Sequence, residues 1–93
     1  MTDFEFATLI YKILFKNDED CKNMNAQAVL DAIENLDIEL KQAIELHHRH
    51  GMNFAQVGKE IGRSQNTART YTMKARMIVR SSLYLQMRAA RNF

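Results

Sequence analysis

The sequence predicts an all-α domain of four or five helices, and three observations support this fold class. The chain has 93 residues, no proline and three glycines, which leaves few positions for the turns of a many-stranded β fold. Apolar residues recur at three- and four-residue intervals, which is the period of a helix with one buried face. The length suits a single hydrophobic core. We divide the chain into an acidic N-terminal helical segment, residues 1–35, and a segment 36–93 with an extended C-terminal helix.

Two helices are expected in the first segment. The first covers residues 4–15, with Thr2 or Asp3 as its N-cap. Its apolar stripe is wide for its length, so it needs a covering surface within the domain or on a partner. After a polar stretch typical of a loop, Asn25 is the expected N-cap of a second helix over residues 26–36.

Two further helices are expected before the longest one. Asp37 is the expected N-cap of a helix that ends at Gly51, since a left-handed glycine commonly terminates a helix. Asn53 and Gln56 match a capping box, in which each side chain bonds the backbone amide of the other residue. The short helix that follows is expected to close at Gly62.

The last expected helix is long and basic, with Ser64 as its N-cap and residues 65–88 as its span. Projection at about 100° per residue places mostly small and apolar side chains on one side of this helix, and we expect that side to pack on the rest of the domain. That side holds Ala68, Tyr71, Ala75, Ile78 and Ser82. The opposite side is expected to face solvent and holds Gln65, Arg69, Thr72, Arg76 and Arg80.

Charge is distributed unevenly along this chain, whose formal net charge is +2. Residues 1–40 contain nine acids and three bases, whereas residues 61–93 contain seven bases and no acid. A block of positive charge attracts polyanions and raises the rate of encounter with them. The other interpretation of this block is an ordinary solvated helix surface.

A short helix, a tight turn with a glycine and a long basic helix together predict a helix-turn-helix. The turn covers residues 60–64. Arginine can bond guanine bidentately, glutamine and asparagine can bond adenine, and the amides of a helix N-terminus can hold a phosphate. We therefore expect double-stranded DNA as the ligand. The alternative is a bundle helix whose arginines contact only water.

Residues 36–80 resemble region 4 of the sigma-70-type bacterial transcription initiation factors. The strongest match is FAQVGKEIGRSQNTARTYTMKAR, residues 54–76, with Ser64 at the family's cap position and Lys74-Ala75-Arg76 at its basic end. The resemblance implies a stand-alone region 4-like domain that lacks the other sigma regions. Its implied function is that of a bacterial or phage transcription regulator, which reads the major groove of DNA with the helix that starts at Ser64.

The resemblance also implies which residues contact DNA. The family reads the −35 promoter element with this helix, which gives base or nearby phosphate contacts to Gln65, Asn66, Arg69 and Thr70. With the groups at the cap and along the basic side, the expected DNA-binding residues are Arg63, Ser64, Gln65, Asn66, Thr67, Arg69, Thr70, Lys74, Arg76 and Arg80. Gln65 and Ala68 depart from the family's charged and branched residues, so the −35 sequence itself is not carried over.

Protein partners follow from the same resemblance. Residues 26–50 would match the part of the family that docks on the flap of the RNA polymerase β subunit. Residues 1–35 are too few for the domain that melts the −10 element, so a complete sigma factor is not expected. The alternative function is a protein that docks on RNA polymerase or on another sigma factor without reading DNA. Apolar residues 83–88 either pack on the helix at 4–15, which we favour, or form a homodimer.

The remaining side chains predict no metal site, cofactor or enzyme activity. His47 and His50 share a helical face, but a fourth ligand is missing, and the helix dipole favours histidine at a helix C-terminus. The acidic residues 18–20 lack the spacing of a calcium loop and are expected to be solvated. No phosphate-binding glycine loop and no nucleophile beside a base occurs in the sequence.

Localisation is expected to be cytoplasmic. Cys21 is the single cysteine and cannot form an internal disulfide, which fits a reducing compartment. The longest apolar runs are far shorter than a bilayer span, and the first residues lack the basic start of a secretory signal. We therefore expect no membrane partner.

Overall fold

The computed structural model describes residues 1–16 and 24–91, with side chains up to residue 86, and this part of the chain is helical and contains no strand. The all-α prediction is confirmed. The helices are α1 (Asp3–Leu14), α3 (Ala26–Glu34), α4 (Ile38–Ile44), the π-helical turn η1 (Glu45–Arg49), α5 (Phe54–Ile61) and α6 (Gln65–Arg91).

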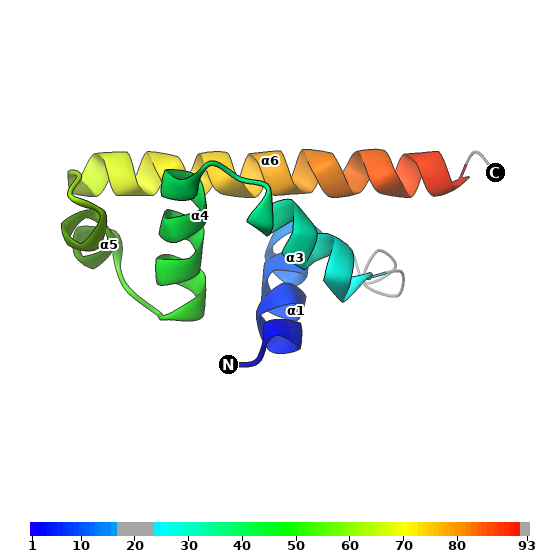
Figure 1. The fold of residues 1–93 in the computed structure, drawn as a ribbon, viewed down its shortest axis with the longest axis horizontal. Coiled ribbons are helices and arrows are strands. Elements are labelled where there is room, and N and C mark those ends of the chain that lie inside the picture. The colour runs from blue at the N-terminus through cyan, green and yellow to red at the C-terminus, as the bar shows by residue number, and fades with distance from the viewer. Residues whose placement is uncertain (17–23, 92–93) are drawn as a thin grey trace.

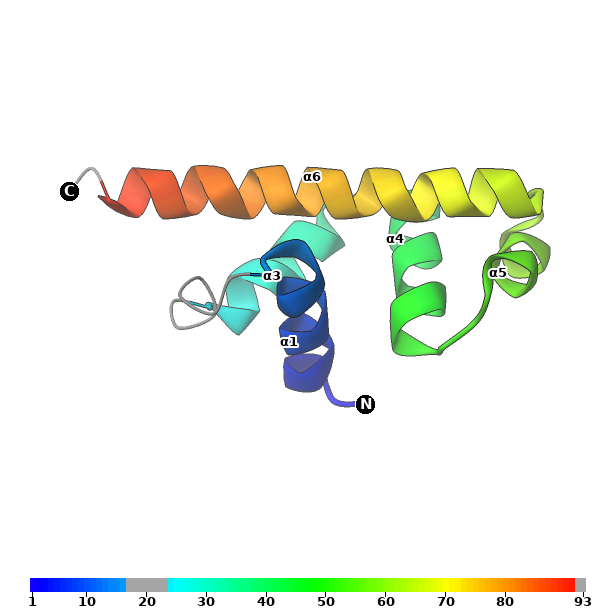
Figure 2. The same ribbon diagram turned by 180° about the vertical axis from the view of Figure 1, so that it is seen from behind.

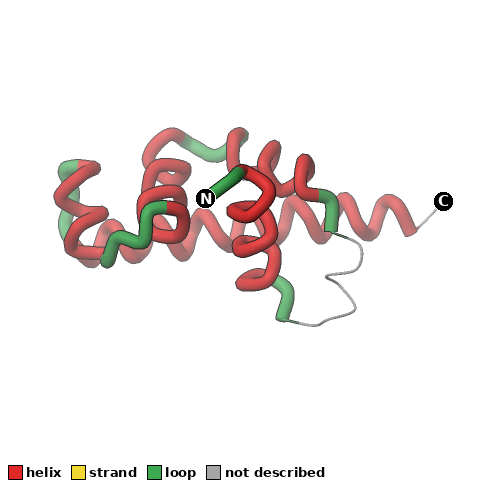
Figure 3. Tube along the Cα trace, turned by 90° about the horizontal axis from the view of Figure 1, so that it is seen from below, coloured by secondary structure: helices red, strands yellow, loops and turns green. Residues whose placement is uncertain are grey.

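The long helix α6 runs the length of the molecule, and all the other helices lie on one side of it (Figures 1 and 2). Seen from that side, α1, α3, α4 and α5 cover α6, and the C-terminal end of α6 projects beyond them (Figure 3). The molecule is accordingly elongated, with extents of 45 × 22 × 20 Å. No described helix is both long and apolar enough to cross a bilayer.

Local capping chemistry sets the start of most helices. Thr2, not Asp3, caps α1 through a capping box with Glu5, and Asn25 caps α3 by accepting a hydrogen bond from the Ala28 amide. Asn53 forms the expected capping box at the start of α5. Asp37 occupies the N-cap position of α4 as expected, although its side chain makes no capping hydrogen bond.

The third expected helix is not regular to its end. After α4 it continues as η1, in which the His50 amide donates to the Glu45 carbonyl at 3.2 Å, a five-residue spacing. This wider turn was not visible in the sequence pattern. The segment then ends at Gly51, as predicted, with a left-handed backbone of φ 69°.

The core divides into a large and a small cluster. The large cluster joins α1, α3 and α4 to the second half of α6 and includes the fully buried side chains of Phe6, Ile10 and Val29. The small cluster lies under the helix-turn-helix and has Ala43, Val57 and Ala68 as its buried members. Tyr71 is partly buried and packs against both clusters.

The buried side of α6 differs from the projected one. It consists of Ala68, Thr72, Ala75, Val79 and Leu83, all at most 4% exposed. Thr72 is therefore not on the solvent side, and burial is tolerable because its hydroxyl donates to the Ala68 carbonyl at 2.9 Å. Ile78, which was expected in the core, is 47% exposed. The buried stripe is rotated by part of a turn from the projected one, because contacts with the other helices decide which side of α6 is covered.

The expected packing of the C-terminal apolar residues holds for Leu83. Its side chain is 4% exposed and belongs to the cluster that also contains Phe6 and Phe15 of the first helix region. Tyr84 and Leu85 are 56% and 64% exposed. The side chains of Met87 and Arg88 lie outside the described residues.

Candidate nucleic-acid interface

The helix-turn-helix is formed by α5, the turn 62–64 and α6. Gly62 ends α5 with a left-handed backbone, φ 71°, as the sequence predicts. Gly58 is a second required glycine, because a Cβ there would lie 2.7 Å from the Arg63 carbonyl oxygen and 2.9 Å from that of Ser64. The turn therefore packs directly against the backbone of α5, and this contact fixes where α6 begins.

The cap of α6 forms as predicted. The Thr67 amide donates to Ser64 Oγ at 3.1 Å, and Ser64 Oγ donates to Thr67 Oγ1 at 2.9 Å. The amides of Gln65 and Asn66 lie in the first turn of α6, where backbone N–H groups have no intrahelical acceptor, so they point out of the helix end. Together with the positive end of the helix dipole they can bind an anion such as a phosphate.

The outward side of the first half of α6 carries amide and cationic side chains. Gln65, Asn66, Arg69 and Lys74 are exposed. Within the described residues, neither Arg69 nor Lys74 forms an ion pair. Their charges are therefore available to a ligand. The exposed Thr70 donates its hydroxyl proton to the Asn66 carbonyl at 3.0 Å, and Thr67 is half-buried.

Arg63 differs from these residues because it is already paired. Its Nη2 donates to Glu39 Oε1 on α4 at 2.8 Å, and both side chains are about half exposed, at 49% and 45%. The hydrogen bond from Arg63, followed by one from Tyr71, lowers the pKa of Glu39. The bond to Glu39 correspondingly raises the pKa of Arg63. This pair spans 24 residues of sequence, so no local pattern could have indicated it.

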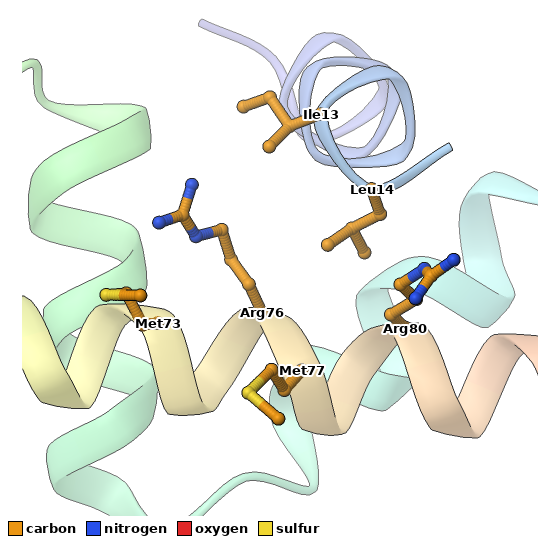
Figure 4. Close-up of a pocket in the computed structure, with 6 residues that line it drawn as sticks. All are labelled: Ile13, Leu14, Met73, Arg76, Met77 and Arg80. Carbon is orange, nitrogen blue, oxygen red and sulfur yellow. The ribbon is translucent and has the colours of Figure 1, made fainter. Parts of the chain in front are cut away.

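Arg76 and Arg80 lie on the side of α6 that faces α1. Arg76 is half-buried, and the guanidinium carbon of Arg80 lies 5.9 Å from the centre of the Phe15 ring. Figure 4 shows both side chains rising from α6 toward the end of α1. The structure therefore separates the predicted DNA-binding residues into an outward group on the first half of α6 and a pair beside α1.

His47 and His48 lie in η1, where they pack with other side chains, whereas His50 follows η1 and is exposed. The ring of His47 stacks on Phe54 at 4.3 Å between centroids, and its Nδ1 lies 2.7 Å from the Met52 carbonyl oxygen. His48 Nε2 is buried without a hydrogen-bond partner among the described residues. Burial, then the charges of His47 and Arg76, lower the pKa of His48 to about 4.

Metal-binding groups are not gathered in the described part of the chain. Within residues 1–16 and 24–91, no three histidine, cysteine, aspartate or glutamate side chains lie close enough to hold an ion. The acidic residues 18–20 and Cys21, which the sequence analysis considered, lie outside the described residues.

Comparison with known proteins agrees with the helix-turn-helix geometry. The family model of sigma-70 region 4 matches residues 26–78, from the start of α3 to the middle of α6. This range is more than half of the chain, and α1 lies outside it. No curated protein and no solved structure matches the chain.

Proposed function

Since the chain belongs to the sigma-70 region 4 family, we propose that it regulates bacterial or phage transcription by reading duplex DNA in the major groove with α6. The family is one of DNA-binding helix-turn-helix domains that act in transcription, and it is not a family of enzymes. Beyond the family's function, we propose how this chain recognises the DNA sequence and which residues contact the bases and phosphates.

The observation that carries the proposal is the outward side of the first half of α6. Gln65, Asn66 and Arg69 are exposed there at the start of a helix whose opposite side is fully buried. Arginine suits the O6 and N7 atoms of guanine, and the two amides suit the N6 and N7 atoms of adenine. We assign base contacts to these three side chains.

Phosphate contacts surround the base contacts. The free amides at the start of α6, next to Ser64, hold one phosphate, and Thr67 and Thr70 are short enough for the helix to approach the backbone. Lys74 lies one to two turns further along α6, and Arg76 and Arg80 supply positive charge beyond it. Arg63 contributes when it exchanges Glu39 for a phosphate oxygen.

The test is fluorescence anisotropy on a random duplex and a −35-like duplex across a series of salt concentrations. Tight binding with a steep negative salt slope is expected, because each neutralised phosphate releases counterions. Arg69→Ala should weaken binding by about 1–3 kcal/mol and reduce the preference between the two duplexes. Lys12→Ala removes an exposed cation of α1 and is the matched control.

The possible outcomes test separately whether the chain binds DNA and whether Arg69 contacts the bases. If Arg69→Ala binds every duplex as tightly as the parent chain, α6 does not present the side that we assign to the bases. If the parent chain fails to bind any duplex at about 50 mM salt, DNA reading itself is wrong.

A second candidate function is docking on RNA polymerase or on another sigma factor without reading DNA. It is favoured by a cavity of about 270 Å³ whose lining contains four acidic residues, Asp3, Asp31, Glu34 and Glu45, and one cation, Arg49, which pairs with Asp3. A predominantly acidic surface repels DNA and is complementary to a basic surface of a partner protein. Copurification of polymerase that survives nuclease treatment, from a chain that binds no DNA, would establish this function instead.

A further inference from the structure

We propose that a groove between α1 and α6 binds an acidic amphipathic helix of a partner protein. The groove has a volume of about 310 Å³ and is lined by Ile13, Leu14, Met73, Arg76, Met77 and Arg80. Two of these residues come from the end of α1, which lies outside the family match, and four come from the middle of α6 (Figure 4). The site is therefore a feature of this chain and not only of the matched segment.

The floor of the groove is apolar and accessible. Met73 and Met77 are 45% and 68% exposed, and Ile13 and Leu14 are half-buried beside them. Tyr84 continues the same side of α6 two turns later and is 56% exposed. The spacing of these α6 residues is that of a helix side that packs along another helix. Methionine side chains adapt to ligands of different shape, which is why they recur at helix-binding surfaces.

The charge of the groove specifies the occupant. Arg76 and Arg80 border the apolar floor, and no acidic side chain is among the described residues that line it. Neither arginine forms an ion pair within the described part of the chain. An apolar floor with a positive border is complementary to a helix with apolar residues three or four apart and acidic residues on both flanks.

Other occupants fit this groove less well. A nucleic acid would satisfy the two arginines, but its phosphates gain nothing from the exposed thioethers and methyl groups between them. A second copy of this chain is disfavoured because its acidic helices α1 and α3 bury their own apolar sides, including Phe6 and Val29, in the core. A partner helix that is both acidic and apolar meets both requirements.

The test selects short random peptides from a displayed library on the full chain and rejects those that also bind the Met77→Ser variant. Enriched peptides should be acidic, with apolar residues three or four positions apart. One of them is then synthesised with a fluorescent label, and its affinity is measured by anisotropy at about 100 mM salt, where exposed charges beyond a Debye length are screened.

The variants distinguish the groove from the rest of α6. Met77→Ser should weaken peptide binding about tenfold, and Arg76→Gln with Arg80→Gln should weaken it about fivefold. Ile78→Ser is the matched control, because Ile78 is also exposed on α6, at 47%, but does not line the groove. Met77 and Ile78 are both exposed, so circular dichroism should show that Met77→Ser and Ile78→Ser fold like the parent chain.

Three results would overturn the proposal. The first is an enriched set that is basic or neutral, or a selection in which no peptide survives rejection on Met77→Ser. The second is equal loss of peptide binding in Met77→Ser and Ile78→Ser. The third is a Met77→Ser variant that loses DNA affinity as strongly as peptide affinity, which would make the groove part of a nucleic-acid surface.

Discussion

The two halves of α6 belong to one continuous helix but have different surroundings. In the first half, residues 65–74, the exposed side carries amides and cations and the buried side contacts the small cluster through Ala68. In the second half, Ala75, Val79 and Leu83 enter the large cluster formed with α1 and α3. The proposed base contacts thus lie in the first part of α6 and the large cluster contacts the second part, so substitutions in the two parts should affect different properties.

The largest effect is expected in the second half. Leu83→Ala should lower the free energy of unfolding by about 2–5 kcal/mol, because it leaves a cavity among fully packed side chains. DNA affinity of the folded protein should change by less than about twofold, since Leu83 is buried and lies far along α6 from Gln65, Asn66 and Arg69, the assigned base contacts. Urea unfolding followed by circular dichroism measures the first quantity, and anisotropy measures the second.

Arg69→Ala should show the opposite pattern. Its loss of about 1–3 kcal/mol in DNA binding should come with a change of less than about 0.5 kcal/mol in the free energy of unfolding, because the side chain is exposed and unpaired within the described residues. If both variants lose stability and affinity together, the two halves are one cooperative unit and the division is wrong.

The stability of the chain should respond to pH through His48 of η1. The pKa of His48 is lowered from 6.5 to about 4, chiefly by burial, so the folded chain resists a proton that the unfolded chain accepts. The free energy of unfolding should therefore fall as the pH falls from about 6.5 to about 4, and level off below that range. Thermal unfolding at a series of pH values should show a shallower dependence in His48→Gln.

His50→Gln is the matched control for this measurement, because His50 follows η1 and is exposed. It should retain the pH dependence of the parent chain. An unchanged dependence in His48→Gln would show that His48 is protonated in the folded state like an ordinary surface histidine.

The smallest effect concerns Arg63, the paired cation of the interface. Glu39→Gln removes the charge that holds Arg63, so DNA binding should strengthen slightly and its logarithmic salt slope should become steeper by about one. Glu34→Gln is the control, because Glu34 pairs with Lys41 at 2.7 Å, away from the turn. A slope identical to that of the parent would mean that Arg63 contacts no phosphate even when it is released.

Much of the fold could be predicted because it depends on local chemistry. Thr2, Asn25, Asn53 and Ser64 cap helices in the way that their own side chains and nearby amides dictate. Gly62 was recognisable because only a glycine adopts its left-handed backbone without strain. The all-α class and the position of the turn follow from these signals.

The remainder depends on contacts between distant segments. Helical projection put Thr72 on the solvent side with Gln65 and Arg69, whereas packing against the other helices buried it, and the Ala68 carbonyl accepts its hydroxyl proton. The pairing of Arg63 with Glu39 and the division of the basic residues by α1 also require knowledge of which helices meet. Of the candidate site, the outward group could be predicted and the groove beside α1 could not.

The division of the core has a consequence for hydrogen exchange. The helix-turn-helix rests on three fully buried small side chains, Ala43, Val57 and Ala68, while the opposite end of the molecule buries phenylalanine, isoleucine and leucine. Amides of α5 should therefore exchange through local openings that leave α1 and α3 intact. An end of the molecule that opens at low cost can adjust its angle to a duplex while the larger cluster holds the second half of α6 in place.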